Sequence, residues 1–246
     1  MKTRWSQLSL IEEPLEKNPR HLSNSNEHHT PPMIVEAARK ALGTIDLDPA
    51  SCVEANDQRV KAEKFYSAED NGFEKEWDGT VFLNPPGGHC DEHGISVVRR
   101  AKEWCCSDSC NHKHHGVVSS QKAWWQRLVL KWEMGKIKSA VFIGFSIEIL
   151  QTTQVDSIGQ LPLEFPMCFP SRRIAYWKEV ETIDDSDPMF AEAGSPPHAS
   201  VLIFMPEMGG ERLLSSYMSK ETHVSIQKFL DAFSPIGRVV IPYVWR

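Results

Sequence analysis

Val81-Phe82-Leu83-Asn84-Pro85-Pro86-Gly87-Gly88 is the stretch of sequence that decides the fold. A run of β-forming residues stops there against two prolines and two glycines. Proline has no amide hydrogen for a sheet ladder, and paired glycines permit tight curvature of the backbone. The pattern therefore predicts that a strand ends at Asn84 and that the Asn84 side chain projects from the carboxyl end of that strand. In open α/β sheets this is the edge where ligands bind.

Helical and strand patterns alternate on both sides of this stretch. Thr30-Pro31-Pro32 predicts the start of a helix that ends at Gly43, and residues 44–48 alternate apolar and polar side chains as a strand does. The further elements that we expect are the helices 123–134 and 224–233 and the strands 139–149, 199–205 and 238–245. This alternation predicts an α/β fold with a mixed, mostly parallel sheet and helices on both faces. The last strands lie too close together for helical crossovers, so we expect an antiparallel edge at the C-terminal end.

The composition is that of a globular protein with one sizeable core. Of the 246 residues, 41% are apolar and 24% are charged, and no stretch approaches the roughly 18 apolar residues of a membrane helix. Residues 1–29 show little periodicity and no apolar secretion signal, so we expect a flexible N-terminal arm and a cytoplasmic protein with no membrane partner. The net charge of −6 argues mildly against nucleic acid, although binding depends on local basic patches and not on the sum.

Four short motifs follow one another between residues 30 and 86. They are Thr30-Pro31-Pro32, Ile45-Asp46-Leu47-Asp48-Pro49-Ala50-Ser51, Glu69-Asp70-Asn71-Gly72 and Phe82-Leu83-Asn84-Pro85-Pro86. In content and order they resemble the phage-type DNA N-6-adenine methyltransferase (Dam-like) family, which belongs to the S-adenosylmethionine-dependent amino methyltransferases. The resemblance continues through Arg172-Arg173-Ile174 and from Ser195 to Phe204, so it covers most of residues 30–206. It implies a Rossmann-like methyltransferase domain over residues 30–246, with DNA as the partner and the target base flipped out.

The Asn-Pro-Pro motif carries a specific chemistry in this family. An exocyclic base amine is a poor nucleophile because its lone pair is delocalised into the ring, so an enzyme must favour the pyramidal form that occurs in the transition state. The side-chain oxygen of Asn84 and the main-chain carbonyl of Pro85 could each accept one amine hydrogen, while Pro86 stiffens the loop. S-adenosylmethionine carries the reactive methyl group. The resemblance therefore implies methyl transfer to the N-6 amine of adenine in DNA.

The residues implied in cofactor binding have structural alternatives. The implied set is Thr30, Pro31, Asp48, Pro49, Ala50 and Asp70. Asp48 resembles the acid that receives the methionine ammonium of the cofactor, but it could also cap a helix. Asp70 is implied in binding the adenosine moiety and could equally be an exposed turn acid, because no glycine-rich fingerprint is present. Thr30 and Pro31 are implied in shaping the pocket, although helix capping also explains them.

The catalytic loop departs from the family directly after Asn-Pro-Pro. The family usually has an aromatic residue there, which stacks on the extruded base, whereas this chain has Gly87 followed by Gly88. Stacking contributes about 1–3 kcal/mol of binding free energy per base. Another side chain must therefore bind the base if these glycines face it. Trp124 and Trp125 are candidates, and core packing on a helix is the alternative for both.

A polar stretch at about residues 88–118 is rich in cysteine and histidine. The candidate metal ligands are Cys90, His93, Cys105, Cys106, Cys110 and His112. These residues supply soft and borderline ligands at spacings that could hold a tetrahedral zinc. The pattern is not one of the regular paired knuckles, so the ligand assignment stays open, and a surface insertion without metal is the alternative. A structural zinc here would order a DNA-contacting lobe beside the catalytic loop.

Two basic patches are candidates for contact with DNA phosphates. The first includes Lys122, Arg127 and Lys131, for which a solvated helix face is the alternative, and the second is Arg172-Arg173.

Three other functions also stay open. Cytosine N-4 methylation uses the same amine chemistry, and a protein-glutamine methyltransferase also uses an Asn-Pro-Pro loop. A catalytically inactive DNA-binding relative would fit both the missing aromatic residue and the missing glycine fingerprint.

Overall fold

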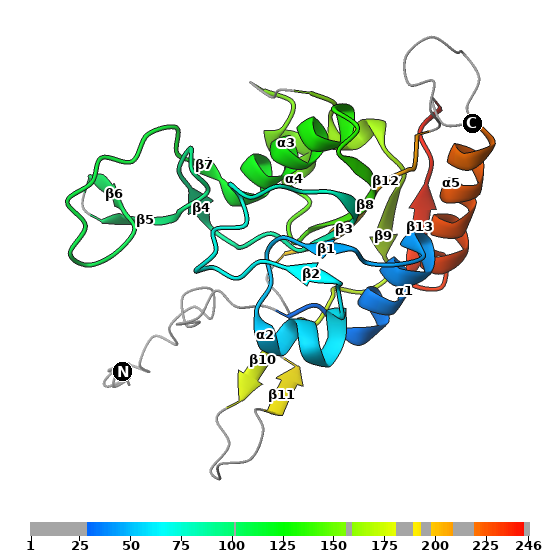
Figure 1. The fold of residues 1–246 in the computed structure, drawn as a ribbon, viewed down its shortest axis with the longest axis horizontal. Helices are drawn as coiled ribbons and strands as arrows, with labels where there is room; N and C mark the ends of the chain where they lie inside the picture. The colour runs from blue at the N-terminus through cyan, green and yellow to red at the C-terminus, as the bar shows by residue number, and fades with distance from the viewer. Residues whose placement is uncertain are drawn as a thin grey trace, which may run out of the picture.

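A seven-stranded mixed sheet forms the centre of the molecule in the computed structural model (Figure 1). The structure describes residues 29–100, 102–155, 159–180, 189–192, 198–208 and 219–243. The predicted arm, apart from His29, and residues 195–197 therefore lie outside the described residues. The strand order is β13-β9-β12-β8-β3-β1-β2. The strands are β1 (Leu47–Asp48), β2 (Lys64–Phe65), β3 (Gly79–Leu83), β8 (Ile137–Gly144), β9 (Met167–Pro170), β12 (Val201–Met205) and β13 (Gly237–Val240).

One half of this sheet is parallel and the other half is antiparallel. β2, β1, β3 and β8 pair in parallel, whereas β12 is antiparallel to β8 and β9, and β13 is antiparallel to β9. The predicted α/β fold with an antiparallel edge is confirmed, but the antiparallel share is larger than the expected mostly parallel sheet would have. The reason is that β12, which follows β9 in the chain, inserts between β8 and β9.

Helices cover both faces of the sheet, as the alternation of elements predicts (Figure 1). On one face, α1 (Pro32–Leu42) and α5 (Lys220–Phe233) pack on side chains such as Phe82. On the other face, α3 (Ser120–Glu133) and α4 (Ile149–Thr152) pack on side chains such as Val81 and Leu83. Successive side chains of a strand point to opposite faces, so the apolar run that ends at Leu83 supplies both cores.

Local chemistry shifts several boundaries from their predicted positions. The helix expected over 224–233 begins at Lys220, because the Ser219 hydroxyl accepts a hydrogen bond from the Thr222 main-chain N–H (3.1 Å) and caps it. The strand expected over 139–149 ends at Gly144, and the chain then turns into α4. The strand expected over 238–245 ends at Val240, two residues before Pro242.

Short elements make the remaining connections. A turn of helix, α2 (Val53–Ala55), continues into a π-helix, η2 (Asn56–Val60), and together they join β1 to β2. A 3-10 turn, η3 (Pro162–Glu164), precedes β9, and β10 (Trp177–Val180) pairs with β11 (Met189–Glu192) as a separate ribbon. None of the described helices is long and apolar enough to cross a membrane.

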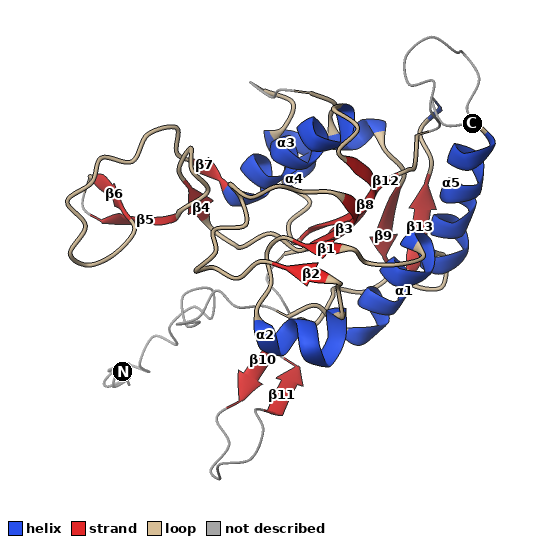
Figure 2. Ribbon diagram, viewed as in Figure 1, coloured by secondary structure: helices blue, strands red, loops and turns tan. Residues whose placement is uncertain are grey.

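The Cys/His-rich stretch forms a separate small sheet that projects from the main body (Figure 1). Its strands are β4 (His89–Cys90), β5 (Ser96–Arg100), β6 (Glu103–Cys105) and β7 (Val118–Ser119), in the order β6-β5-β4-β7 with antiparallel pairing. Figure 2 shows a long loop between β6 and β7. We call residues 89–119 the insertion. It leaves the body directly after Gly88 and returns at the start of α3.

Candidate functional site

The order of the parallel strands reverses between β1 and β3. The chain leaves β1 for β2 on one side and then returns to β3 on the other side. Leu47 pairs with Val81 in parallel, so Asp48, the last residue of β1, and Asn84, which follows β3, lie toward the same edge of the sheet. In open α/β sheets, ligands bind at the carboxyl ends of the strands where the strand order reverses. The structure therefore brings two of the predicted site residues to the edge that favours a ligand.

Asp48 is a buried acid at this edge. It is 3% exposed and accepts a hydrogen bond from the Ala50 main-chain N–H (3.2 Å). Burial raises the pKa of Asp48 to about 7, although the hydrogen bond from Ala50 opposes the rise. Within the described part of the chain, no lysine, arginine or histidine forms an ion pair with Asp48. A bound cation would therefore supply the carboxylate with a counter-charge that none of the described residues provides.

The loop after Asp48 is held by the end of β2 and by the acidic turn. The Tyr66 main-chain carbonyl accepts a hydrogen bond from the Ser51 main-chain N–H (2.9 Å). The Tyr66 main-chain N–H donates to the Asp48 carbonyl (3.0 Å). A Cβ atom on Gly72 would lie 2.0 Å from the Pro49 carbonyl oxygen, so only glycine permits this close approach. Two of the resembling motifs, 45–51 and 69–72, thus pack against each other.

Asp70, in contrast, serves the turn that contains it. It is exposed, and its carboxylate accepts hydrogen bonds from the Ser67 main-chain N–H (2.9 Å) and hydroxyl (2.8 Å). These hydrogen bonds lower the pKa of Asp70 below its ordinary value. The turn-acid alternative accounts for this geometry, and Asp70 lies on the surface beside the Asp48 loop.

Thr30 and Pro31 are both buried at the start of α1. The Pro31 carbonyl accepts the Ile34 N–H (3.0 Å), whereas no side chain caps this end of the helix. Capping by the Thr30 hydroxyl, the alternative suggested by the sequence, is therefore wrong.

The Asn84–Gly88 loop rests on the start of α3. Asn84 is half-buried and Pro85 is buried. The Ser120 main-chain N–H donates to the Gly88 carbonyl (3.0 Å), and the Ser120 hydroxyl donates to the Gly87 carbonyl (3.5 Å). A Cβ atom on Gly87 would meet no atom within 4 Å, so this residue faces open space.

Trp124 and Trp125 belong to the core and are 4% and 0% exposed. Trp124 stacks on Trp77 with ring centroids 5.8 Å apart, and Trp125 donates its ring N–H to the Gln160 carbonyl (3.1 Å). The packing alternative accounts for both residues, and neither is presented to a base beside Gly87. Their spacing on α3 fits a buried helix face, which the sequence alone did not separate from a base-binding role.

The basic residues of α3 are engaged within the chain. Lys122 donates to the Val155 carbonyl (2.5 Å), and Lys131 pairs with Glu76 (3.3 Å). Arg127 donates to the Lys75 carbonyl (2.9 Å) and lies over the Phe73 ring, 5.1 Å from its centroid. This patch is therefore not a row of solvated cations available to phosphates.

Arg172 and Arg173 lie at the same edge of the sheet as Asp48 and Asn84. β8 and β9 are both antiparallel to β12, so they run in the same direction, and Arg172 and Arg173 follow the carboxyl end of β9. Both arginines are exposed. Further exposed basic residues, which the sequence analysis missed, lie on the insertion: Arg99, Lys102 and Lys113. These basic residues are few and stand among acidic ones, so the sequence shows no basic cluster there.

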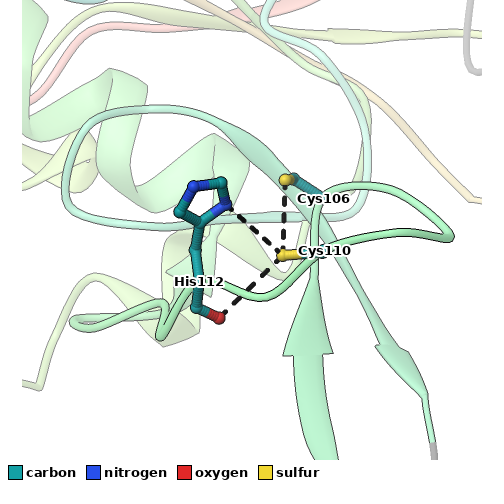
Figure 3. A group of neighbouring side chains, drawn as sticks. All are labelled: Cys106, Cys110 and His112. Carbon is teal, nitrogen blue, oxygen red and sulfur yellow. Dashed lines mark hydrogen bonds between the residues drawn. The ribbon is translucent and has the colours of Figure 1, made fainter.

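Three of the predicted metal ligands come together in the insertion (Figure 3). The ligand atoms of Cys106, Cys110 and His112 all lie within 4.8 Å of one another. The Cys110 sulfur is 3.6 Å from the Cys106 sulfur and 3.8 Å from Nδ1 of His112. A main-chain hydrogen bond at Cys106 and the imidazole of His114 lower the pKa of the Cys110 thiol to about 5. The lowered pKa favours the thiolate form of Cys110, which is the form that binds metal.

The other predicted ligands have different surroundings. Cys90 is buried in β4, where burial raises the pKa of its thiol to about 11. His93 contacts Glu74 through Nδ1 (2.9 Å), and Cys105 is half-buried at the end of β6. None of these three belongs to the Cys106–Cys110–His112 group. The group could hold a metal ion, and thiolate with imidazole is a donor set that suits zinc.

Comparisons with known protein families, with curated protein sequences and with solved structures find no significant match to this chain.

Proposed function

We propose that this protein transfers a methyl group from S-adenosylmethionine to the exocyclic N-6 amine of adenine in DNA, on a Rossmann-like methyltransferase fold. The observation that carries the proposal is the position of Asp48, the last residue of β1, and Asn84, which follows β3, the adjacent parallel strand, where the strand order reverses. That edge is where open α/β sheets bind their ligands. Two of the resembling motifs, 45–51 and 82–86, thus meet at one edge of the sheet, and this supports the proposal.

The surroundings of Asp48 fit the cationic end of the cofactor. A buried carboxylate whose pKa is about 7, and which forms no ion pair with a described residue, gains a favourable partner when an ammonium binds. Asp48 would hold the methionine ammonium, and the Pro49–Ala50 loop, fixed by Gly72, would line the pocket. The cofactor supplies the reactive sulfonium methyl group when it is bound.

Asn84 and Pro85 would orient the amine of the flipped base. The Asn84 side-chain oxygen and the Pro85 carbonyl accept the two amine hydrogens, so the nitrogen lone pair points away from both acceptors. These acceptors stabilise the pyramidal amine more than the planar one, and this difference lowers the barrier. The nitrogen becomes acidic as it gains the methyl group, so the proton leaves to water and no strong base is required. The contacts of Ser120 with Gly87 and Gly88 support a fixed loop.

Exposed arginines support DNA as the partner. Arg172 and Arg173 follow β9 at the same edge as Asn84, where they would contact the phosphates of the distorted strand. Exposed Arg99 and Lys113 of the insertion would add a second contact. The metal that we propose for the Cys106–Cys110–His112 group is zinc, with a structural role.

Identification of the methylated nucleoside tests the proposal. Purified protein is incubated with labelled S-adenosylmethionine and unmethylated DNA, and the digested DNA is separated into nucleosides. We expect label on N-6-methyladenine, lost in Asn84→Ala and kept in Gln227→Ala, an exposed amide on α5. Label on N-4-methylcytosine would contradict adenine as the substrate and would show that the same amine chemistry acts on cytosine. Absence of label from DNA, despite cofactor binding, would contradict the proposal and favour an inactive DNA-binding protein.

A further inference from the structure

The Cys106–Cys110–His112 group is one ligand short of a closed metal site. Structural zinc sites have four protein ligands in a tetrahedral arrangement. His114, which the sequence analysis did not include among the ligands, lies against the group: its Nε2 atom is 3.2 Å from the Cys110 sulfur. Its side chain is only 5% exposed, although this loop lies on the surface of the insertion.

The separations of the Cys110 sulfur from the other three ligand atoms are close to the edges of a zinc tetrahedron. Zn–S bonds of about 2.3 Å and Zn–N bonds of about 2.05 Å give edges of about 3.8 Å between two sulfurs and about 3.6 Å between sulfur and nitrogen. The observed separations from the Cys110 sulfur are 3.6 Å to Cys106, 3.8 Å to His112 and 3.2 Å to His114. The three separations from Cys110 thus fit a zinc ion. His114 would have to approach Cys106 or His112 to close the site, because it lies outside the group of ligand atoms that are all within 4.8 Å of one another.

A buried carboxylate fixes the orientation of His114. Nδ1 of His114 lies 2.8 Å from Oδ2 of Asp91, whose side chain is also only 5% exposed. The other oxygen, Oδ1, accepts the main-chain N–H groups of His93 (3.0 Å) and Ile95 (2.9 Å). In the zinc-bound form, a neutral His114 with its proton on Nδ1 would offer the Nε2 lone pair to the metal held by Cys110. Histidines that bind metal usually donate their second N–H to a carboxylate in this way.

We propose that Cys106, Cys110, His112 and His114 form a closed tetrahedral zinc site, with Asp91 as the positioning residue of His114. The proposal rests on the metal assigned above and is independent of methyl transfer. It replaces Cys90, His93 and Cys105 as ligands by a single histidine. The resulting motif is Cys-x3-Cys-x-His-x-His.

The site has a structural consequence for the catalytic loop. Among the described residues of the insertion, only Cys90 and Val97 are buried apolar side chains, so packing supplies little folding energy there. Zinc would tie the 106–114 loop, through Asp91, to β4, which begins directly after Gly88. β4 pairs with β7, which leads into Ser120 and its hydrogen bond to Gly88. Metal binding would therefore order the support of the Asn84–Gly88 loop.

Metal content and cobalt spectra test the proposal on the full chain. We expect about one zinc per chain after dialysis, and we expect Co²⁺ in its place to give the strong visible bands of tetrahedral coordination with thiolate-to-cobalt charge transfer. Asp91→Asn should weaken zinc binding about 10- to 100-fold, and His114→Ala should weaken it further. His115→Ala, which changes the exposed neighbouring histidine, is the matched control and should bind as the wild type does.

Two results would overturn the assignment. One is a wild-type cobalt spectrum without tetrahedral bands, which does not depend on any variant folding. The other is equal zinc affinity in His114→Ala and His115→Ala, with tryptophan fluorescence showing that both variants keep the folded body. Unchanged affinity in Asp91→Asn would remove Asp91 from its positioning role. These readouts need neither DNA nor S-adenosylmethionine, so they stand apart from the outcome of the methylation assay.

Discussion

Replacing Asp48 with asparagine should stabilise the free protein and abolish cofactor binding at the same time. Burial raises the pKa of Asp48 from its ordinary value of 3.8 to about 7, and at a pH above both values this difference is worth about 4 kcal/mol. The folded-state pKa is the higher one, so the folded chain holds the extra proton between about pH 4 and pH 7. The free energy of unfolding therefore falls as the pH rises through this window. Asparagine carries no charge, so Asp48→Asn should remove most of this fall.

Chemical denaturation at several pH values measures this effect. Asp48→Asn and wild type should be similar in stability near about pH 4, and the variant should be more stable by up to about 4 kcal/mol near about pH 8. Asp57→Asn, an exposed acid in the same β1–β2 connection, is the matched control and should show no such growth with pH. A stability difference that does not increase with pH would refute the burial argument.

The affinity for the cofactor should rise with pH, whereas the free energy of unfolding falls. An ammonium binds the ionised carboxylate, whose share falls from about one half at about pH 7 to about one tenth at about pH 6 for a group with a pKa near 7. Calorimetric titration with S-adenosylmethionine should therefore show an affinity about fivefold lower at the lower pH. Asp48→Asn should lose both the affinity and this pH dependence. Wild-type affinity in Asp48→Asn would refute the assignment of the ammonium site.

Three further predictions concern the loops around the site. Gly87→Phe should tighten binding of DNA by about 1–3 kcal/mol per stacked base, because a Cβ atom at Gly87 meets no atom within 4 Å; equal dissociation constants would show that this position does not face the base. Arg172→Ala and Arg173→Ala should each reduce the slope of log affinity against log salt by about 0.9, and an unchanged slope would remove that arginine from the phosphate contacts. Gly72→Ala should lower both the melting temperature and the cofactor affinity, because its Cβ atom would lie 2.0 Å from the Pro49 carbonyl oxygen; wild-type values for both would contradict the close packing of the two loops.

The fold could be predicted where local chemistry decides it. The strand that ends at Asn84, the proline-started α1 and the insertion all follow from prolines, glycines and periodicity in a few neighbouring residues. The position of β12 between β8 and β9 could not be read in the same way, because strand order depends on contacts between distant segments. The parallel share of the sheet was overestimated for that reason.

The candidate site shows the same limit. Trp124 and Trp125 are aromatic residues near a catalytic motif, and the sequence does not say which face of α3 points to the core. His114 was missed as a ligand because its evidence is a contact with Asp91, which lies 23 positions earlier in the chain. Asp48 and Asn84, in contrast, could each be placed at the end of a strand in advance, because a proline follows directly after each of them.

Methyl transfer and cofactor binding measured together on Asn84→Ala test the central claim most directly. Asn84 is proposed to orient the base amine and Asp48 to hold the cofactor, so Asn84→Ala should bind S-adenosylmethionine as the wild type does while labelling of adenine in DNA is lost. Asp48→Asn should lose both. Full transfer of label to DNA by Asn84→Ala would contradict the account.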